Sequence, residues 1–270
     1  MPDGAPASLA AQVQSVLWYH TLQLGDLVTP GWFDLRPIVD RMPWPDVAGM
    51  RCLDVGTYDG FLAFELERRG AAEVVAIDIF DHEKWDWPPD VRATGAANLA
   101  LLAGQERGVG FRLAHEVLRS SVKLRQMSVY DLDPDELGTF DVITCGTLLL
   151  HLRDPLRALE AIRRVCRGVF MSSEQIDLSL TVRNRRDAVA RLNGSGSLCQ
   201  WWVPNSAGHR RMVFAAGFEI ERGVRPYAVP FGSGHPEGSP VRKRAAAATQ
   251  RLLLGNAGVA HSAVLARPRV

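Results

Sequence analysis

The sequence predicts an α/β fold: a seven-stranded mixed sheet, parallel apart from a late antiparallel pair of strands, flanked by helices and covered by an N-terminal helical cap. The main observation is that short apolar runs alternate with helical stretches of about 10–20 residues from residue 51 onward, as in βαβ units. The second is composition, because 47% of the 270 residues are hydrophobic and 23% are charged. This balance supplies a full core and excludes a disordered chain.

The first 48 residues are interpreted as the cap. Apolar residues between positions 9 and 24 recur at helical spacing, so we expect a helix over residues 8–24. Residues 29–37 then combine proline, glycine and aromatic residues, which is typical of a turn. Residues 49–270 would form the main domain beneath this cap.

Seven apolar runs of strand length follow the cap. The helix after the first run is expected to end at Gly70, and a later helix to begin with Pro155 in its first turn. Residues 228–258, rich in proline and glycine and then in alanine, predict a flexible insertion with a short helix between the last two strands. The predicted strands cover residues 51–55, 73–78, 122–127, 140–145, 167–172, 217–223 and 260–266.

Charge and cysteine content narrow the partners and the compartment. With 31 Lys+Arg against 30 Asp+Glu, the net charge of +1 gives no overall field toward nucleic acid or an anionic membrane. The four cysteines form no CxxC pair, which predicts reduced, buried thiols. There is no membrane-length apolar run and no cationic leader before an apolar segment. We therefore expect a cytoplasmic protein without a membrane span, whose oligomeric state the sequence does not predict.

A glycine turn between the first strand and its helix is the strongest motif. The residues Leu53-Asp-Val-Gly-Thr-Tyr-Asp-Gly60 place Gly56 and Gly60 where the backbone must turn sharply and approach a ligand. Asp78 ends the next strand, 22 residues after Gly56, where an acid can hydrogen-bond both hydroxyls of a ribose. This spacing predicts an adenosine-containing ligand. The alternative is a tight turn in which Asp78 only caps a helix.

The turn lacks the third glycine of the NAD fingerprint, and the chain has no phosphate-binding Gly-x-x-x-x-Gly-Lys-Ser/Thr loop. Residues 50–175 resemble the Rossmann-like domain of class I S-adenosylmethionine-dependent methyltransferases. Asp59 stands where that family usually has glycine or cysteine, which leaves its role open between loop stabilisation and ligand contact. The resemblance implies S-adenosylmethionine as cofactor, with the methionine part held by Asp54, Gly56, Thr57, Tyr58 and Gly60, the ribose by Asp78, the adenine by Ser128 and Val129, and the sulfonium beside Gly146.

Two titratable residues follow the fourth and fifth strands on the same side of the sheet. His151 could take the proton of a hydroxyl that attacks the methyl group, because an imidazole titrates near neutral pH. Alternatively, it only braces its turn. Glu174 could bind an acceptor hydroxyl, orient His151 or, with Asp177, help to hold a divalent cation such as Mg²⁺, although no spacing demands a metal. A solvated acid is the plain alternative.

Aromatic residues supply the candidates for substrate binding. Indole rings can stack on a sugar face or a base, although ordinary core packing is an equal alternative. His20 is a second acid/base candidate on the cap, with a structural role as its alternative. Residues 18–20, 29–34 and 201–206 are similar to a methyltransferase branch that includes tRNA wobble-uridine 5-oxyacetate-forming enzymes and actinobacterial O-methyltransferases of sugars and other small hydroxylated molecules. The proposed substrate-binding set is His20, Trp32, Trp201, Trp202 and Asn205.

Three functions are compatible with these features. The first is an O-methyltransferase for a polar small molecule, a sugar or short saccharide, with His151 and Glu174 as the catalytic pair. The second is a tRNA wobble-uridine modification enzyme, which the neutral net charge disfavours. The third is a non-catalytic cofactor-binding module, because a fold does not fix a function.

Overall fold

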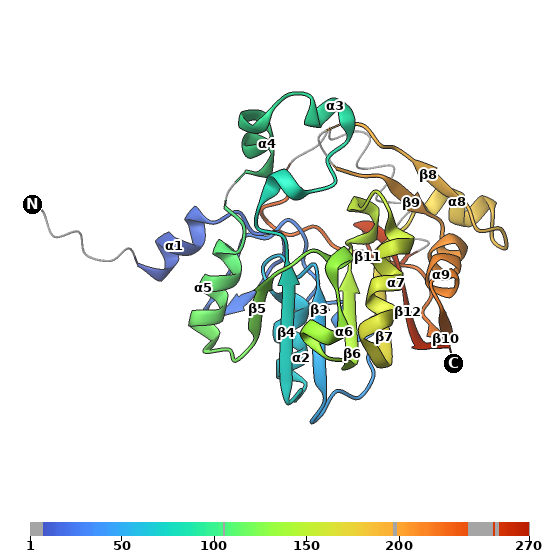
Figure 1. The fold of residues 1–270 in the computed structure, drawn as a ribbon. Helices are drawn as coiled ribbons and strands as arrows, with labels where there is room; N and C mark the ends of the chain where they lie inside the picture. The colour runs from blue at the N-terminus through green and yellow to red at the C-terminus, as the bar shows by residue number, and fades with distance from the viewer. Residues whose placement is uncertain (1–7, 105, 197–198, 237–250, 252–253, 270) are drawn as a thin grey trace, which may run out of the picture.

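One mixed sheet organises the computed structural model, which describes residues 8–104, 106–196, 199–236, 251 and 254–269 (Figure 1). The sheet has the strand order β10-β12-β7-β6-β3-β4-β5. Each of the seven predicted strands is confirmed by one of these. Their bounds are β3 (Arg51–Val55), β4 (Glu73–Asp78), β5 (Lys123–Gln126), β6 (Phe140–Gly146), β7 (Cys166–Gln175), β10 (Phe218–Gly223) and β12 (Val259–Pro268).

The five strands β5, β4, β3, β6 and β7 run parallel to one another, and β12 runs antiparallel to both β7 and β10. The late antiparallel pair is therefore confirmed. An eighth, short strand, β11 (Tyr227–Val229), pairs with the start of β12 and corrects the predicted count of seven. It was missed because it opens the proline- and glycine-rich stretch 228–258. Residues 237–250, 252 and 253 of that predicted insertion lie outside the described residues.

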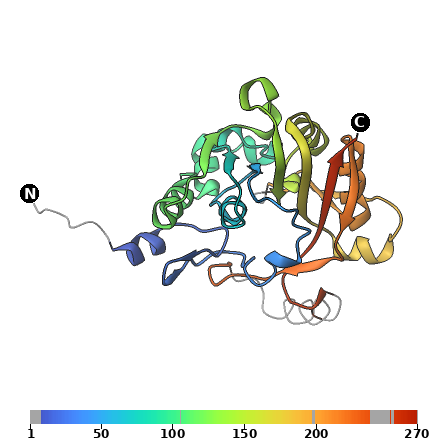
Figure 2. The same cartoon turned by 90° about the horizontal axis from the view of Figure 1, so that it is seen from below.

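Strand alternation divides the core into two halves, one on each face of the sheet. On β3, Cys52 packs into one half and its neighbour Leu53 into the other. The first half contains α2 (Phe61–Arg68), α5 (Val109–Leu118) and the N-terminal segment. The second contains α6 (Pro134–Leu137), α7 (Pro155–Val165) and α9 (Ser206–Ala215). Figure 2 shows the N-terminal segment and α7 on opposite sides of the sheet.

The segments above the carboxyl ends of the strands are built from short elements (Figure 1). Those between β4 and β5 are η2 (His82–Lys84), α3 (Pro89–Arg92) and α4 (Ala96–Ala103), followed by α5. After β7 come α8 (Leu178–Arg183) and the hairpin of β8 (Ala190–Leu192) and β9 (Trp202–Pro204). Two further short turns are η3 (Val129–Asp131) and η4 (Leu149–His151). None of the helices in the described ranges is long and apolar enough to cross a bilayer.

The predicted helix over residues 8–24 is wrong beyond its first half. Helix α1 covers only Leu9–Ser15, and the rest of the N-terminal segment forms the hairpin of β1 (Gln23–Leu24) and β2 (Leu27–Val28) and the turn η1 (Val39–Arg41). The cause is a distant carboxylate, because Asp59 accepts hydrogen bonds from the backbone N–H groups of Tyr19 and His20. Those N–H groups are unavailable to a helix.

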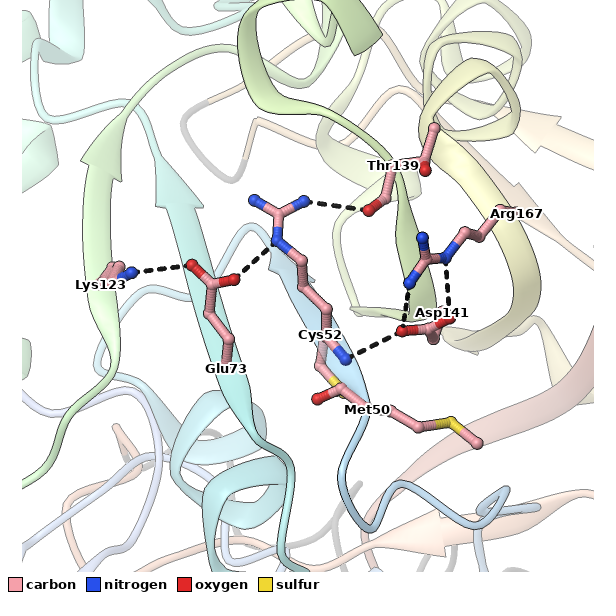
Figure 3. A network of polar contacts seen from close by, with 8 residues as sticks. Met50, Cys52, Glu73, Lys123, Thr139, Asp141 and Arg167 are labelled. Carbon is pink, nitrogen blue, oxygen red and sulfur yellow. Dashed lines mark hydrogen bonds and ion pairs between the residues drawn. The ribbon is translucent and has the colours of Figure 1, made fainter.

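The amino ends of the central strands are joined by a network of ion pairs (Figure 3). Glu73 accepts from Arg51 Nε at 2.7 Å and Lys123 Nζ at 2.8 Å, which links β4 to β3 and β5. Asp141 accepts from the Arg51 N–H at 3.0 Å and pairs with Arg167, which links β6 to β3 and β7. These side chains are partly exposed, so each pair contributes little stability. These ion pairs lie at the amino ends of the strands, whereas the glycine turn lies at the carboxyl ends.

Phe170→Ala tests the packing of the second core half. Phe170 is fully buried on β7, with its ring 5.0 Å from that of Phe218. The truncation should lower the free energy of unfolding by about 3–5 kcal/mol, because it removes apolar contacts and leaves a cavity. Urea denaturation measures this. Leu156→Ala on α7 is the control, since Leu156 is 42% exposed and should change stability by less than about 0.5 kcal/mol. Equal urea midpoints for the two variants would contradict the packing described.

Candidate active site

The glycine turn has a backbone that glycine alone fits comfortably. Gly56 has φ +74° and Gly60 φ +93°, both in the left-handed region. A Cβ on Gly60 would lie 2.4 Å from the Phe64 ring, and one on Gly56 would lie 3.0 Å from the Leu148 side chain. Tyr58, between them, also has a positive φ of +51°. The turn therefore presents a tightly folded backbone with no room for side chains at its two glycines.

Asp78 closes this turn from the end of β4. Its two carboxylate oxygens accept the N–H groups of Tyr58 and Ile79, each at 2.7 Å. Burial raises the pKa of Asp78, while the Tyr58 N–H and the charge of Arg107 act in the opposite direction. A carboxylate offers about four acceptor sites, so two remain for ligand hydroxyls. Asp78 thus fixes the turn and can also bind a ribose.

Asp54 lies one strand away, at the end of β3, and is almost completely buried. It accepts a hydrogen bond of 2.7 Å from Thr144 Oγ1 on the neighbouring strand β6. Burial raises the pKa of Asp54 to about 6, although the hydrogen bond from Thr144 opposes that rise. The Thr57 side chain is buried in the turn itself. A cationic group bound nearby would keep Asp54 ionised.

The other predicted cofactor residues lie on the adjoining strands. Ser128 caps η3, Val129 is its first residue, and the preceding Met127 donates its N–H to the Asp78 carbonyl at 3.0 Å. Gly146 ends β6, where a Cβ would come within 2.7 Å of the Leu62 side chain. The predicted cofactor residues therefore gather along the carboxyl ends of four adjacent strands, β5, β4, β3 and β6. Ligands of open α/β sheets bind at such an edge.

Asp59, whose role the sequence left open, joins the N-terminal segment to the turn. One oxygen accepts the Tyr19 N–H at 2.9 Å and the His20 N–H at 2.7 Å, and the other contacts Nδ1 of the His20 ring. The Asp59 side chain is 1% exposed. Its structural role is therefore to stabilise the loop and to orient the His20 imidazole.

His151 lies in η4, just after β6. Its Nδ1 is 3.0 Å from the Cys199 carbonyl oxygen. Because a carbonyl only accepts, Nδ1 carries the proton and Nε2 is left as an acceptor in the neutral ring. Burial and the positive charge of Arg107 lower the pKa of His151, although the bond to Cys199 opposes this. The backbone N–H of Trp201 also donates to the Leu150 carbonyl at 2.7 Å. The residues from Cys199 to Trp201 therefore hold η4 in place.

Glu174 is fully buried on β7 and contacts the start of η4. Its oxygens accept the N–H groups of Leu148 and Leu149, both at 3.2 Å. Burial raises the pKa of Glu174 to about 8, against the opposing effect of these two N–H groups. It forms no hydrogen bond with His151 in the described structure, so it positions the start of η4 and does not orient the imidazole directly.

No group of three histidine, cysteine or acidic residues suited to a metal occurs within the described ranges. Asp177, the suggested partner of Glu174, instead caps α8 and pairs with Arg191 at 2.8 Å.

A small cavity lies between the N-terminal segment and the end of β6. Its volume is about 20 Å³, and its lining includes Tyr19, His20 and Phe33 on one side and Gly146, Thr147 and His261 on the other. The Thr147 hydroxyl is 3.0 Å from Nε2 of His261, whose Nδ1 donates to the Val259 carbonyl. Burial lowers the pKa of His261 to about 4, so the ring is neutral at physiological pH. The cavity is therefore a shielded, partly polar space directly beside Gly146.

Comparison with known proteins identifies the family. A family model described as a methyltransferase domain matches residues 34–221. The chain belongs to this methyltransferase family. It is 33% identical over 120 residues to the ubiquinone biosynthesis O-methyltransferase of Xanthomonas oryzae pv. oryzae (strain PXO99A), covering 44% of this chain and 40% of that protein. With the protein of the same name from Acinetobacter baumannii (strain ACICU), identity is 29% over 162 residues, covering 57% and 56%. The chain thus spans about half the length of these curated relatives.

Solved structures share the fold of this methyltransferase. The N-terminal domain of EvdMO1 with S-adenosylhomocysteine bound has a TM-score of 0.52 at 16% identity, covering 97% of this chain and 95% of that one. A putative S-adenosylmethionine-dependent methyltransferase from Listeria monocytogenes has a TM-score of 0.50 at 15% identity, covering 86% and 96%. The predicted class I fold is thereby confirmed. The cofactor S-adenosylmethionine is supported by the methyltransferase family to which the chain belongs. Membership of the branch with the tRNA enzymes stays a prediction.

The residues present fit this cofactor. The glycine turn gives a ligand close access to backbone, and Asp78 keeps free acceptor sites at the end of β4. The methyltransferase would use the turn and Asp54 for the methionine part and Asp78 for the ribose. Ser128 and Val129 adjoin Asp78 on the side expected for adenine.

The residues predicted to bind substrate fall into two groups, with His20 and Trp32 around Tyr19 on the N-terminal segment and the others between residues 201 and 205. Trp32 is on the N-terminal segment, with its ring 6.1 Å from that of Tyr19. The indole N–H groups of Trp201 and Trp202 donate to the carbonyls of Asp86 at 2.6 Å and Arg153 at 3.1 Å. Asn205 is fully buried at the start of α9, and its amide bonds only to backbone, with Gly208, Val189, Asn184 and Asp187 as partners. We therefore leave Asn205 out of the proposed substrate site.

Sequence reasoning missed several residues that shape this site. Asp86 accepts the Tyr130 hydroxyl at 2.6 Å and the Arg153 N–H at 2.8 Å, which ties the segment after β4 to η3 and η4. His261 and Arg107 also border the site. None of the three stands in a recognisable motif, and their partners are far away in the chain. Among the residues that shape the site, Asp59 was noticeable in the sequence, because it is an acid within the glycine turn.

Asp78→Ala should weaken binding of S-adenosylhomocysteine by about 10- to 100-fold, because it removes charge-assisted hydrogen bonds to the ligand and to the turn. Calorimetric titration measures this. Glu73→Ala is the matched control, since Glu73 lies at the opposite end of the same strand. It should leave the dissociation constant unchanged. Equal losses in both variants would indicate damage to β4 and not a lost ligand contact.

Glu174→Gln tests the buried carboxyl group through pH. The pKa of Glu174 is about 8 in the folded protein, against an ordinary value of 4.5. Between these values the folded state keeps a proton that the unfolded chain has released, so the contribution of Glu174 to stability falls as pH rises. The glutamine variant cannot lose this proton, and its unfolding free energy should depend less on pH.

Urea midpoints at pH 5 and pH 8 measure this difference. Glu160→Gln, at an exposed position on α7, should keep the wild-type dependence. An unchanged pH dependence in Glu174→Gln would show that Glu174 ionises normally.

Proposed function

We propose that this protein is an O-methyltransferase that moves the methyl group of S-adenosylmethionine to a hydroxyl of a polar small molecule, a sugar or short saccharide. The observation that carries the proposal is the set of polar side chains beside Gly146, where the imidazoles of His20 and His261 and the hydroxyl of Thr147 border a small cavity. Two likenesses support it. The curated relatives carry O-methyltransferase names, and the EvdMO1 domain was also crystallised in the presence of S-adenosylhomocysteine and D-fucose.

The cofactor supplies an electrophilic methyl group on a sulfonium. The protein contributes alignment and a base, because methyl transfer is an in-line displacement. Nε2 of His151 would accept the proton of the acceptor hydroxyl. Its Nδ1–H bond to the Cys199 carbonyl fixes the tautomer that leaves Nε2 basic. Glu174 positions the loop before η4, and the rings of Tyr19 and Phe33 exclude water from the cavity.

His20 is the alternative base. Its ring lines the cavity, and Asp59 holds its Nδ1 in the way that a carboxylate orients a catalytic histidine. Separate substitutions of His151 and His20 are needed to show which of the two residues acts as the base.

One observation favours the tRNA alternative. A groove of about 820 Å³ between α8, α9 and β10 is lined by five arginines: Arg185, Arg186, Arg210, Arg211 and Arg225. The net charge of +1 conceals this local concentration. Phosphate contacts by such a groove would make tRNA binding fall steeply with salt. A titration of tRNA between 50 and 200 mM salt that shows no salt-sensitive binding would remove this function.

We infer a cytoplasmic location from the cysteines, which are all free and buried. The partner we propose is the small hydroxylated acceptor.

The experiment that tests the function combines labelled S-adenosylmethionine with separate panels of saccharides and of tRNA, followed by NMR of the methylated product. An O-methyl saccharide supports the proposal, and a methylated nucleoside overturns it.

His151→Asn should lower kcat on the identified acceptor by about 10²- to 10⁴-fold, because the base is lost. Binding of S-adenosylhomocysteine should persist. In the wild type, kcat should fall as pH drops through the pKa of His151, which burial places below 6.5. His115→Asn on α5 is the control, since His115 bonds to the Val122 carbonyl, outside the site. Full turnover in His151→Asn with a loss in His20→Asn would transfer the role of base to His20.

A further inference from the structure

Arg107 occupies an unusual position above the glycine turn. It lies between α4 and α5, directly before Gly108, which is the N-cap of α5 and has φ +79°. Its guanidinium stacks between two aromatic rings, 4.2 Å from the centre of Tyr58 and 4.1 Å from that of Trp85. Tyr58 belongs to the glycine turn, so the two rings hold the guanidinium against the cofactor site.

The polar edge of this guanidinium is only partly satisfied, because a hydrogen bond to the Tyr58 side chain leaves two of its three nitrogens without a partner in the described part of the chain. Its Nε and Nη1 atoms are buried and have no hydrogen-bond partner among the residues that the structure describes. Within the same ranges no carboxylate forms an ion pair with Arg107. Buried charges are normally paired, because desolvation of an unpaired ion is costly. Stacking on two rings fixes the plane of the guanidinium and leaves its N–H groups available for a planar anion.

The electrostatic influence of Arg107 shows which groups it faces. Its charge opposes the rise in the pKa of Asp78 and of Tyr58, both at the glycine turn. It also lowers the pKa of His151, the candidate base. The guanidinium, which stacks on Tyr58 of the glycine turn and on Trp85 after β4, therefore acts electrostatically on both the candidate ribose-binding acid and the candidate base.

Charge balance indicates what binds there. The amino-acid part of S-adenosylmethionine carries an ammonium and a carboxylate that offset each other, so its sulfonium leaves a net positive charge. The carboxylates of Asp54 and Asp78 can offset that charge, whereas the positive charge of Arg107 has no ion-pair partner among the described residues. An acceptor that carried an anionic group would neutralise this charge and satisfy the free N–H groups with short, charge-assisted hydrogen bonds.

We propose that Arg107 binds a carboxylate or phosphate of the acceptor, so that the substrate is an anionic hydroxylated molecule such as a sugar acid or sugar phosphate. This rests on the proposed O-methyltransferase function and narrows its substrate class. The competing source of the same chemistry is the carboxylate of the cofactor itself.

The experiment uses Arg107→Gln, which removes the charge and keeps a polar side chain. Its matched control is Arg112→Gln on α5, where the arginine pairs with Glu106 at 3.0 Å and is half exposed. Calorimetry on the protein saturated with S-adenosylhomocysteine measures binding of inorganic phosphate, D-glucose 6-phosphate and D-glucuronate, with D-glucose as the neutral probe. A second titration compares S-adenosylhomocysteine with 5′-methylthioadenosine, which lacks the amino-acid carboxylate.

We expect at least one anionic probe to bind the wild type about 10-fold or more tightly than D-glucose, with this preference lost in Arg107→Gln and kept in Arg112→Gln. Affinity for S-adenosylhomocysteine should change less than about twofold.

Two results would overturn the proposal. One is a wild type that prefers none of the anions over D-glucose. The other is an Arg107→Gln variant that loses affinity for S-adenosylhomocysteine and keeps it for 5′-methylthioadenosine, which would assign the guanidinium to the cofactor. Failure of the proposed function looks different, because anion binding that depends on Arg107 would then persist while no hydroxyl became methylated.

Discussion

The buried carboxylate of Asp59 joins the N-terminal segment to the glycine turn, and the geometry of the active site follows from that junction. It accepts hydrogen bonds from the backbone N–H groups of Tyr19 and His20, and it also contacts the imidazole of His20. These two residues then line the cavity beside Gly146. The Tyr19 ring lies 5.1 Å from that of Tyr58, on which Arg107 stacks. One carboxylate in the glycine turn thus positions the cavity wall, an imidazole and, through Tyr58, a guanidinium.

The sheet separates structural charges from functional ones. At its amino edge, Glu73 and Asp141 are partly exposed, and neighbouring cations lower their pKa values. At its carboxyl edge, Asp54, Asp78 and Glu174 lie in a drier environment where burial raises their pKa values. Carboxylates held out of water are costly unless a cation compensates for them. A cofactor with a sulfonium and an ammonium brings such compensation, so the acidic edge is complementary to the ligand that the family binds.

Local patterns in the sequence were enough to predict the sheet and the cofactor turn, because each strand is a contiguous apolar run and the turn residues are neighbours in the chain. Contacts between distant segments were not predictable. The apolar periodicity of residues 8–24 favoured a long helix, yet Asp59 takes the N–H groups that the helix would need. The partners of the Trp201 and Trp202 indole N–H groups were likewise not predictable, because the carbonyls of Asp86 and Arg153 lie far away in the chain. Arg107 had no signal at all, since Tyr58 and Trp85 meet it only in the fold.

The position of the anion site bears on the identity of the base. The two imidazoles are held alike, each through Nδ1, by the Cys199 carbonyl for His151 and by the Asp59 carboxylate for His20. They differ in which part of the site they face. Arg107 acts electrostatically on His151, whereas His20 lines the cavity beside Gly146. An acceptor anchored by its anionic group on Arg107 would bring its hydroxyl toward His151, and a neutral acceptor seated in the cavity would bring it toward His20. The charge of the substrate and the identity of the base are therefore linked, because both depend on which end of the site holds the acceptor.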